Sequence, residues 1–138
     1  MTRSREEIVD RLYAEGWGQA DFDVVFELVD PAIVWTAIEN APDAGTYRGH
    51  DEVRAYMQDA LDAFDPGGWQ IEESIELGDR LVCVQRVLGT GKGSRVAIDL
   101  TYSCVYRFGE DNRIVEVNEF ATRDEAIAAA ERSNPGPT

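Results

Sequence analysis

The sequence predicts an α+β fold in which helices pack on one face of a curved antiparallel sheet. Apolar residues at helical spacing dominate the first part of the chain and return at its end, whereas strand-like runs separated by short turns fill residues 69–120. Helices that precede an antiparallel meander form a separate layer over the sheet. The 138 residues suit one compact domain, expected at residues 1–132, followed by a disordered tail at residues 133–138.

Two helices are expected before the first strand. Ser4 and Glu7 form a capping box, ahead of a helix that runs to about Trp17. A second, short helix starts at Asp21 and ends before Pro31, because the residue that precedes a proline disfavours the helical conformation.

Two more helices are expected, one before the strand-rich part and one after it. Asp51 and Glu52 lie in the first turn of the former, where the helix dipole favours acidic side chains. Its predicted apolar face is Val53, Tyr56, Met57, Ala60, Leu61 and Phe64. Thr122 and Glu125 form a capping box that opens the alanine-rich last helix.

Five strands are expected, and the turns within residues 69–120 are short enough to make neighbours antiparallel. A loop at residues 40–45 separates the first strand from the third helix. The predicted strands are Ile33 to Ile38, Trp69 to Leu77, Leu81 to Leu88, Val96 to Phe108 and Ile114 to Phe120.

The alternation of the last strand singles out Glu119. If Val115 and Val117 point toward the helices, Glu119 shares their face. An ionised carboxylate on an apolar face is costly unless it is partnered or its pKa rises, so this residue is a candidate general acid or base. The alternative is a register that leaves Glu119 at the rim of the sheet, in water.

The strand at residues 81–88 is apolar on both faces, apart from Gln85 and Arg86. Depending on the register, either residue enters the interior, and Arg86 in that place could pair with Glu119. A strand covered on both sides also suggests a homodimer through the outer face of the sheet.

The charge of the chain excludes two classes of partner. With 27 acidic and 13 basic residues, its formal net charge is −14, so nucleic acid and anionic membranes are repelled. Since the sequence has no bilayer-spanning apolar run and begins without a signal-peptide core, a cytoplasmic protein is expected.

Cysteine and histidine usage excludes several kinds of site. Cys83 and Cys104 lie in apolar strands without CxxC spacing, which indicates buried free thiols. His50 is the single histidine, so neither a metal site nor a Ser-His-Asp triad is expected. No cofactor is implied, since nucleotide-binding glycine motifs are missing from the sequence.

Taken in their order along the chain, four segments resemble the SnoaL-like branch of the nuclear-transport-factor-two-like superfamily, which also contains ketosteroid isomerase. They are residues 21–23, residues 45–54, the pair 106–108 with 113–115, and residues 122–126. The resemblance covers essentially the whole chain. It implies a cone-shaped half-barrel, with the helices on the concave face of the sheet and a cavity between the two layers that holds a small apolar ligand.

The resemblance to ketosteroid isomerase places its functional positions on Tyr13, Thr36 and Cys104. Tyr13 matches the tyrosine that stabilises the oxyanion, whereas the base falls near Thr36 and the second acid near Cys104. A threonine hydroxyl cannot abstract a carbon-bound proton and a thiol is a weak hydrogen-bond donor, which disfavours steroid-type isomerisation. The arginine and aspartate of the epoxide hydrolase branch are replaced by Tyr102 and Cys104 at the inward positions.

We therefore expect a protein that binds a small hydrophobic molecule bearing a carbonyl or a hydroxyl group. Acid–base chemistry of the isomerase, cyclase or hydrolase type would use Glu119 to move the proton, with Tyr13 or Tyr102 stabilising negative charge. The expected cavity lining is Tyr13, Trp17, Thr36, Tyr56, Tyr102, Cys104 and Glu119. The alternative is a non-catalytic module for ligand binding or protein association. Trp17, Trp35 and Trp69 are interpreted as packing or subunit contacts.

Overall fold

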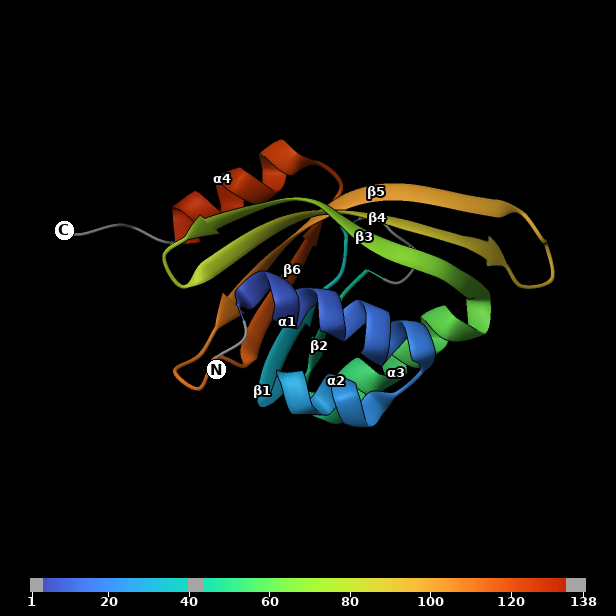
Figure 1. Ribbon diagram of the computed structural model, residues 1–138, viewed down its shortest axis with the longest axis horizontal. Helices are drawn as coiled ribbons and strands as arrows, with labels where there is room; N and C mark the ends of the chain where they lie inside the picture. Colours follow the sequence, from blue (N-terminus) through green and yellow to red (C-terminus); the bar gives the residue numbers. More distant parts are fainter. Residues whose placement is uncertain (1–3, 40–43, 134–138) are drawn as a thin grey trace.

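The computed structural model describes residues 4–39 and 44–133, and it has the predicted α+β architecture (Figure 1). The first helical segment comprises α1 (Arg5–Arg11), a π-helical turn (Leu12–Gly16) and a 3-10 turn (Trp17–Gln19). The expected loop residues 40–43 and the expected tail from residue 134 onward lie outside the described residues. Ser133 is the last residue of the final helix.

The remaining helices begin close to their predicted starts. Asp21 caps α2 (Phe22–Leu28) by accepting a hydrogen bond from the Val24 N–H. The other two helices are α3 (Gly49–Ala63) and α4 (Arg123–Ser133). On α3, Val53, Tyr56, Met57 and Leu61 are buried, which confirms most of the predicted apolar face.

Within the described residues, six strands form one open sheet, in the order β2-β1-β6-β5-β4-β3. Strands β3 to β6 pair antiparallel, as predicted, whereas β1 runs parallel to β6, so the sheet is mixed. The short strand β2 follows the predicted loop and pairs with β1. The strands are β1 (Val29–Thr36), β2 (Thr46–Arg48), β3 (Phe64–Leu77), β4 (Arg80–Gly91), β5 (Ala97–Phe108) and β6 (Ile114–Phe120).

Strand β3 begins five residues before its predicted start, since Phe64, Asp65 and Pro66 already pair with β4. Phe64, predicted on the apolar face of the preceding helix, therefore belongs to the strand. Because β3 is an edge strand, a proline that cannot donate a hydrogen bond is tolerated there.

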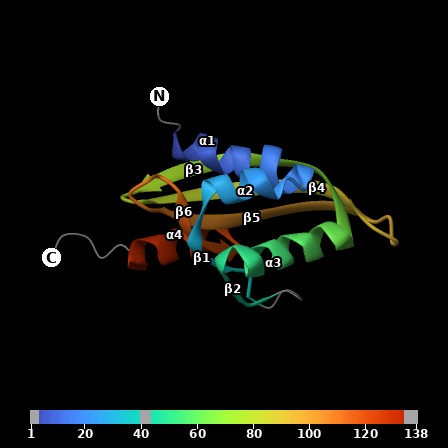
Figure 2. The same cartoon turned by 90° about the horizontal axis from the view of Figure 1, so that it is seen from below.

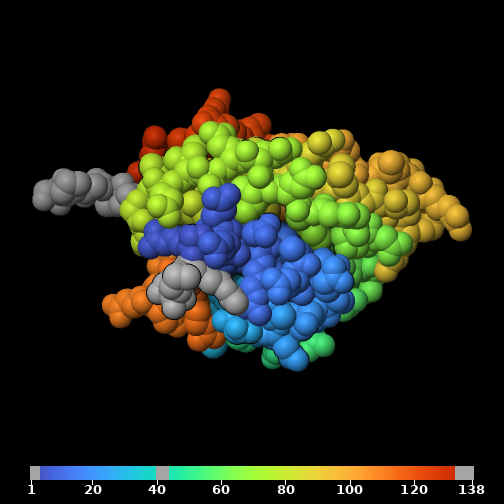
Figure 3. Space-filling view, viewed as in Figure 1, coloured from blue at the N-terminus to red at the C-terminus, as the bar shows by residue number. Residues whose placement is uncertain are grey.

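The helices divide between the two faces of the sheet. Helices α1, α2 and α3 cover the concave face, as predicted (Figures 1, 2 and 3). Helix α4 lies on the opposite face, where Ala126 and Ala130 pack against Val82 and Val105. The sequence predicts helices on one face of the sheet only, so the position of α4 departs from that prediction. Its alanines let it approach the outer face of β4 and β5 closely.

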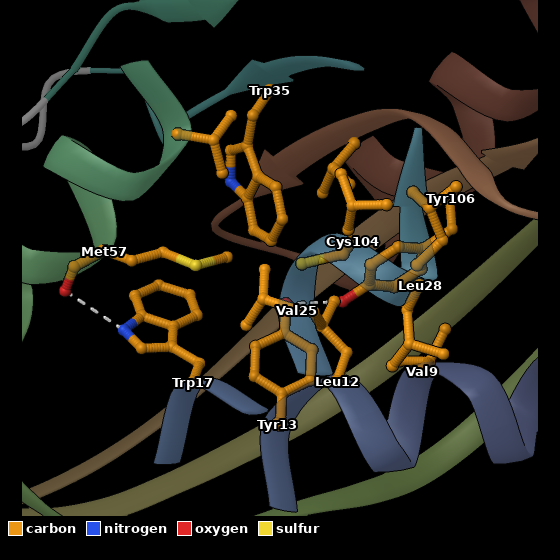
Figure 4. Close-up of a cluster of buried hydrophobic side chains, with 14 of the residues drawn as sticks. Val9, Leu12, Tyr13, Trp17, Val25, Leu28, Trp35, Met57, Cys104 and Tyr106 are labelled. Atoms are coloured by element: carbon orange, nitrogen blue, oxygen red, sulfur yellow. Dashed lines mark hydrogen bonds between the residues drawn. The ribbon is translucent and has the colours of Figure 1, made fainter. Parts of the chain in front are cut away.

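The expected inward positions of β5, Tyr102 and Cys104, are confirmed, whereas the register of β6 contains a bulge. Tyr102, Cys104 and Tyr106 are buried on the concave face (Figure 4 labels the last two). In β6, Phe108 pairs with Ile114 while Arg107 pairs with Glu116. The extra residue lets Ile114 enter the core, whereas Val115, expected to face inward, is half-buried.

The choice between Gln85 and Arg86 is also resolved. Gln85 is buried on the concave face. The guanidinium of Arg86 points the other way and forms a bidentate pair with Asp99, with N···O distances of 2.8 and 2.7 Å. Arg86 is therefore not the partner of Glu119.

Among the described residues, no helix is long and apolar enough to cross a membrane.

The interior on the concave face is closely filled. Ten of its side chains, contributed by the first three helical segments and by the sheet, are labelled in Figure 4.

We expect Leu81→Ala to lower the free energy of unfolding by about 2–5 kcal/mol, because it removes most of a side chain that is only 1% exposed and leaves a cavity. In the matched control Leu100→Ala, the side chain is 48% exposed and the change should be about 0.5 kcal/mol or less. Equal losses by urea denaturation would contradict this packing.

Cys83 and Cys104 face each other across β4 and β5, and both are buried free thiols. Burial raises the pKa of Cys83 to about 12 and raises that of Cys104 well above its usual value.

Since the thiolate is the reactive form, we expect Ellman's reagent at pH 8 to modify neither thiol until the protein unfolds. A Ser94→Cys variant, with an exposed thiol, is the control that reacts in the folded state. Rapid modification of the native wild-type protein would contradict the described burial.

Candidate functional site

Glu119 lies inside the molecule, with only 8% of its surface exposed. It is positioned by β6, directly across from Cys104 on β5. The Trp35 indole donates a hydrogen bond of 3.0 Å to Oε2, and the Tyr56 hydroxyl donates one of 2.8 Å to Oε1. These donors replace water around the carboxylate, so the sequence-based prediction that Glu119 faces inward is confirmed.

The two donors come from elements on opposite sides of the carboxylate. Trp35 belongs to β1, in register with Val117 two residues before Glu119, and it is fully buried. Tyr56 belongs to α3, and its ring stacks on that of Tyr47 from β2 at a centroid distance of 4.6 Å. The parallel pairing of β1 with β6 and the packing of α3 thus hold both donors at the carboxylate.

Beside Glu119 the concave face is hollowed into a pocket of about 180 Å³. Its floor includes Glu119 and Tyr102, and its walls are mainly aromatic, from Trp17, Tyr56, Phe64 and Trp69. Ile38, Ala60, Val87 and Leu100 complete the lining. The arrangement combines apolar walls with few polar groups, as small-molecule sites do.

Tyr102 is the second polar residue of this pocket. Its oxygen accepts hydrogen bonds from the Trp69 indole at 3.1 Å and from the Gln85 amide at 3.3 Å. Burial, with smaller contributions from Cys104 and Glu119, raises the pKa of Tyr102 well above its usual value. The phenol is therefore protonated at neutral pH, and its O–H can donate one hydrogen bond.

A buried chain of hydrogen bonds supports Tyr102 from behind. The Tyr106 hydroxyl donates to the Gln85 oxygen, while the Gln85 nitrogen donates to Tyr102. Since Tyr106 has a single proton, Tyr13 must donate in the contact of 2.7 Å between the two hydroxyls. All four groups are buried, and burial raises the pKa of both Tyr13 and Tyr106 well above the usual value.

The structure therefore brings together only part of the predicted lining. Trp17, Tyr56, Tyr102 and Glu119 surround the pocket. Tyr13 lies behind it, hydrogen-bonded to Tyr106, and is not among the residues that line it. The thiol of Cys104 is fully buried in the core beside Glu119, on the neighbouring strand, and does not line the pocket either.

Thr36 lies away from this pocket, because it pairs with Asn118 in the row of residues that faces α4. Its hydroxyl lies 3.4 Å from that of Thr46. Thr36 and Asn118 line a second hollow of about 490 Å³, between the β1–β6 part of the sheet and α4. This hollow is larger but more polar, and Glu39, Glu125 and Arg132 contribute to it.

Three aromatic residues at the site were not among the predicted site residues. Trp35 donates to Glu119, Trp69 donates to Tyr102, and Phe64 forms part of the wall. Alternation with Ile33 could have placed Trp35 on the inner face of its strand. For Phe64 and Trp69 the sequence offers no such signal, because β3 starts early and contains bulges.

Solved structures of other proteins share the fold of this chain, whereas a comparison with curated proteins gives no match. An NTF2-like protein from Burkholderia thailandensis E264 is 27% identical, with a TM-score of 0.72, covering 94% of this chain and 98% of that one. A protein from Jannaschia sp. CCS1, assigned by its name to the SnoaL-like polyketide cyclases, is 22% identical, with a TM-score of 0.73 and coverages of 94% and 96%.

A third solved structure contains a small organic molecule. It is a protein of ketosteroid isomerase-like fold from Catenulispora acidiphila DSM 44928, in complex with trimethylamine. It is 14% identical to this chain, with a TM-score of 0.71 and coverages of 90% and 92%. Residues 9–117, most of the chain, match the SnoaL-like domain family. The protein therefore belongs to the SnoaL-like domain family and has an NTF2-like fold.

Proposed function

We propose that the protein binds a small, largely apolar molecule in the aromatic pocket and that Glu119 contacts its hydroxyl or carbonyl-bearing end. The observation that carries this proposal is a buried carboxyl group in the lining of a mainly apolar hollow. Burying a charged group is costly, so its place among aromatic side chains favours a functional role. Trp17 and Tyr56 would contact the apolar part of the ligand.

The size of the pocket limits the ligand. Sites for drug-sized molecules have volumes of about 300–1,000 Å³. The volume of about 180 Å³ therefore favours a molecule much smaller than a steroid. The trimethylamine complex of the Catenulispora acidiphila protein supports a small organic ligand for this fold.

The proposed chemistry is proton transfer at a carbon next to a carbonyl group. Glu119 takes the proton from that carbon, the electron pair moves onto the carbonyl oxygen, and Tyr102 donates a hydrogen bond to the resulting enolate. The same carboxyl group then returns a proton to carbon. Tyr13 acts as a positioning residue, since its hydroxyl supports Tyr102 through Tyr106 and Gln85.

The second candidate is a binding module without catalysis. The positions that would hold the base and the second acid of ketosteroid isomerase are Thr36 and Cys104, and neither lines the aromatic pocket. Under this alternative, Glu119 and Tyr102 orient the ligand, and no proton is removed from its carbon atoms.

A homodimer through the outer face of the sheet and a cytoplasmic location belong to the same proposal. Helix α4 already covers the part of that face around Val82 and Val105. A partner subunit would therefore have to use the remaining part, where Arg86 pairs with Asp99.

We expect the wild-type protein to accelerate hydrogen–deuterium exchange next to the carbonyl of cyclohexanone in D2O, as followed by proton NMR. Glu119→Gln keeps the size of the side chain but removes the proton-accepting carboxylate, so the accelerated rate should fall about 100-fold or more. Glu116→Gln is the control, because Glu116 lies on the outward face of the same strand beside Arg107.

Two outcomes would overturn parts of this proposal. Exchange at the wild-type rate in Glu119→Gln would remove Glu119 from the chemistry. If the wild-type protein does not accelerate exchange but cyclohexanone changes its tryptophan fluorescence, the binding module is the correct alternative. Fluorescence is informative because the three tryptophans of the chain all lie at the pocket or contact Glu119.

A further inference from the structure

We infer that the ligand is an organic cation, in which an alkylated ammonium group packs against the aromatic walls and a hydroxyl or carbonyl group reaches Glu119 or Tyr102. This inference rests on the proposed binding pocket and names the chemical class of its ligand.

The walls have the composition that favours a cation over a neutral group of the same shape. Trp17 contacts Trp69 at a centroid distance of 5.3 Å and Tyr56 at 5.9 Å, and all three residues line the pocket. Phe64 extends it, with its centroid 6.2 Å from that of Trp69. The face of an aromatic ring is electronegative and attracts ammonium groups, most strongly in the case of tryptophan.

When ionised, Glu119 would supply a charge of the matching sign in the lining of the pocket. Glu119 is the one ionisable acid or base, apart from the tyrosines, among the described residues that line the pocket. A carboxylate beside low-dielectric walls attracts a cation more strongly than it would in water. The formal net charge of −14 adds a long-range field that concentrates cations around the molecule.

Arginine side chains lie over aromatic rings elsewhere in this protein. The guanidinium of Arg5 lies 5.3 Å from the Phe108 ring centroid, and that of Arg54 lies 4.9 Å from the ring centroid of Phe22. Neither ring lines the pocket. Within the described part of the chain, the arginines over ring faces therefore do not compete with a ligand for the pocket walls.

The size of the pocket and its hydrogen-bonding groups further limit which organic cations it can hold. A quaternary ammonium has no N–H, so its methyl groups can contact the apolar walls without leaving a donor unsatisfied. A hydroxyl two carbons away can then donate to Glu119. A compact cation of this kind suits a volume of about 180 Å³.

The test compares choline with 3,3-dimethylbutan-1-ol, its uncharged carbon analogue of nearly the same shape. We expect the wild-type protein to bind choline about tenfold more tightly than the alcohol, as measured by tryptophan fluorescence. The methyl signal of bound choline should also move upfield in the proton NMR spectrum, because the methyl groups lie over ring faces.

Variants of Glu119 test whether the preference for choline over the uncharged alcohol arises in the pocket. Glu119→Gln should reduce the preference for choline to about threefold, the part that the ring faces contribute. Glu116→Gln changes the net charge equally and should leave the preference at the wild-type value. Glu119→Asp keeps the charge and should retain most of it, which separates loss of charge from loss of folding. Thermal unfolding of each variant checks that the fold is intact.

The outcomes distinguish this inference from the proposed function. Equal affinity for the two probes would overturn the cation inference and leave the pocket proposal standing. Binding of neither probe, nor of cyclohexanone, would overturn the pocket proposal itself. An unchanged preference in folded Glu119→Gln would also overturn the cation inference, because the attraction would then arise away from the pocket.

Discussion

The burial of one carboxylate constrains much of this structure. Glu119 lies on the concave face of the sheet, where an ionised group needs hydrogen-bond donors in place of water. The two donors belong to β1 and α3, so the first strand of the chain and the third helix must both bring side chains to β6. Packing on this face thus serves stability and the site at once.

The polar groups of the interior form two separate systems. Glu119 accepts from Trp35 and Tyr56, whereas Tyr102 ends a chain that begins at Tyr13. In that chain the direction of each hydrogen bond follows from the number of protons available, because each phenol has one proton to donate. The two systems meet at the pocket, which therefore offers an acceptor and a donor in fixed places.

Local patterns in the sequence predict the elements and the inward face well. The expected inward positions of β5, Tyr102 and Cys104, are correct, and capping residues locate most helix starts. The sequence cannot predict the parallel pairing of β1 with β6, since that contact joins segments about 80 residues apart and has no local signal. The bulge that buries Ile114 is missed for the same reason, because it depends on the partner strand.

The candidate site is predicted in part. Glu119 follows from the alternation of one strand, and Trp17, Tyr56 and Tyr102 follow from helical or alternating spacing. Which of the inward residues border empty space depends on how side chains fill the interior, and this removes Tyr13 and Cys104 from the lining. Thr36 was placed by resemblance alone, and the strand register puts it on the outer face.

The bond between Trp35 and Glu119 spans 84 residues of sequence, and it has a consequence for how the molecule is made. Chains emerge from the ribosome amino-terminal end first, and contacts between distant segments form late because long loops must close before they do. A nascent chain that stops before β6 lacks both the carboxylate and the partner strand of β1. Assembly of the site therefore has to wait until almost the whole chain has been synthesised.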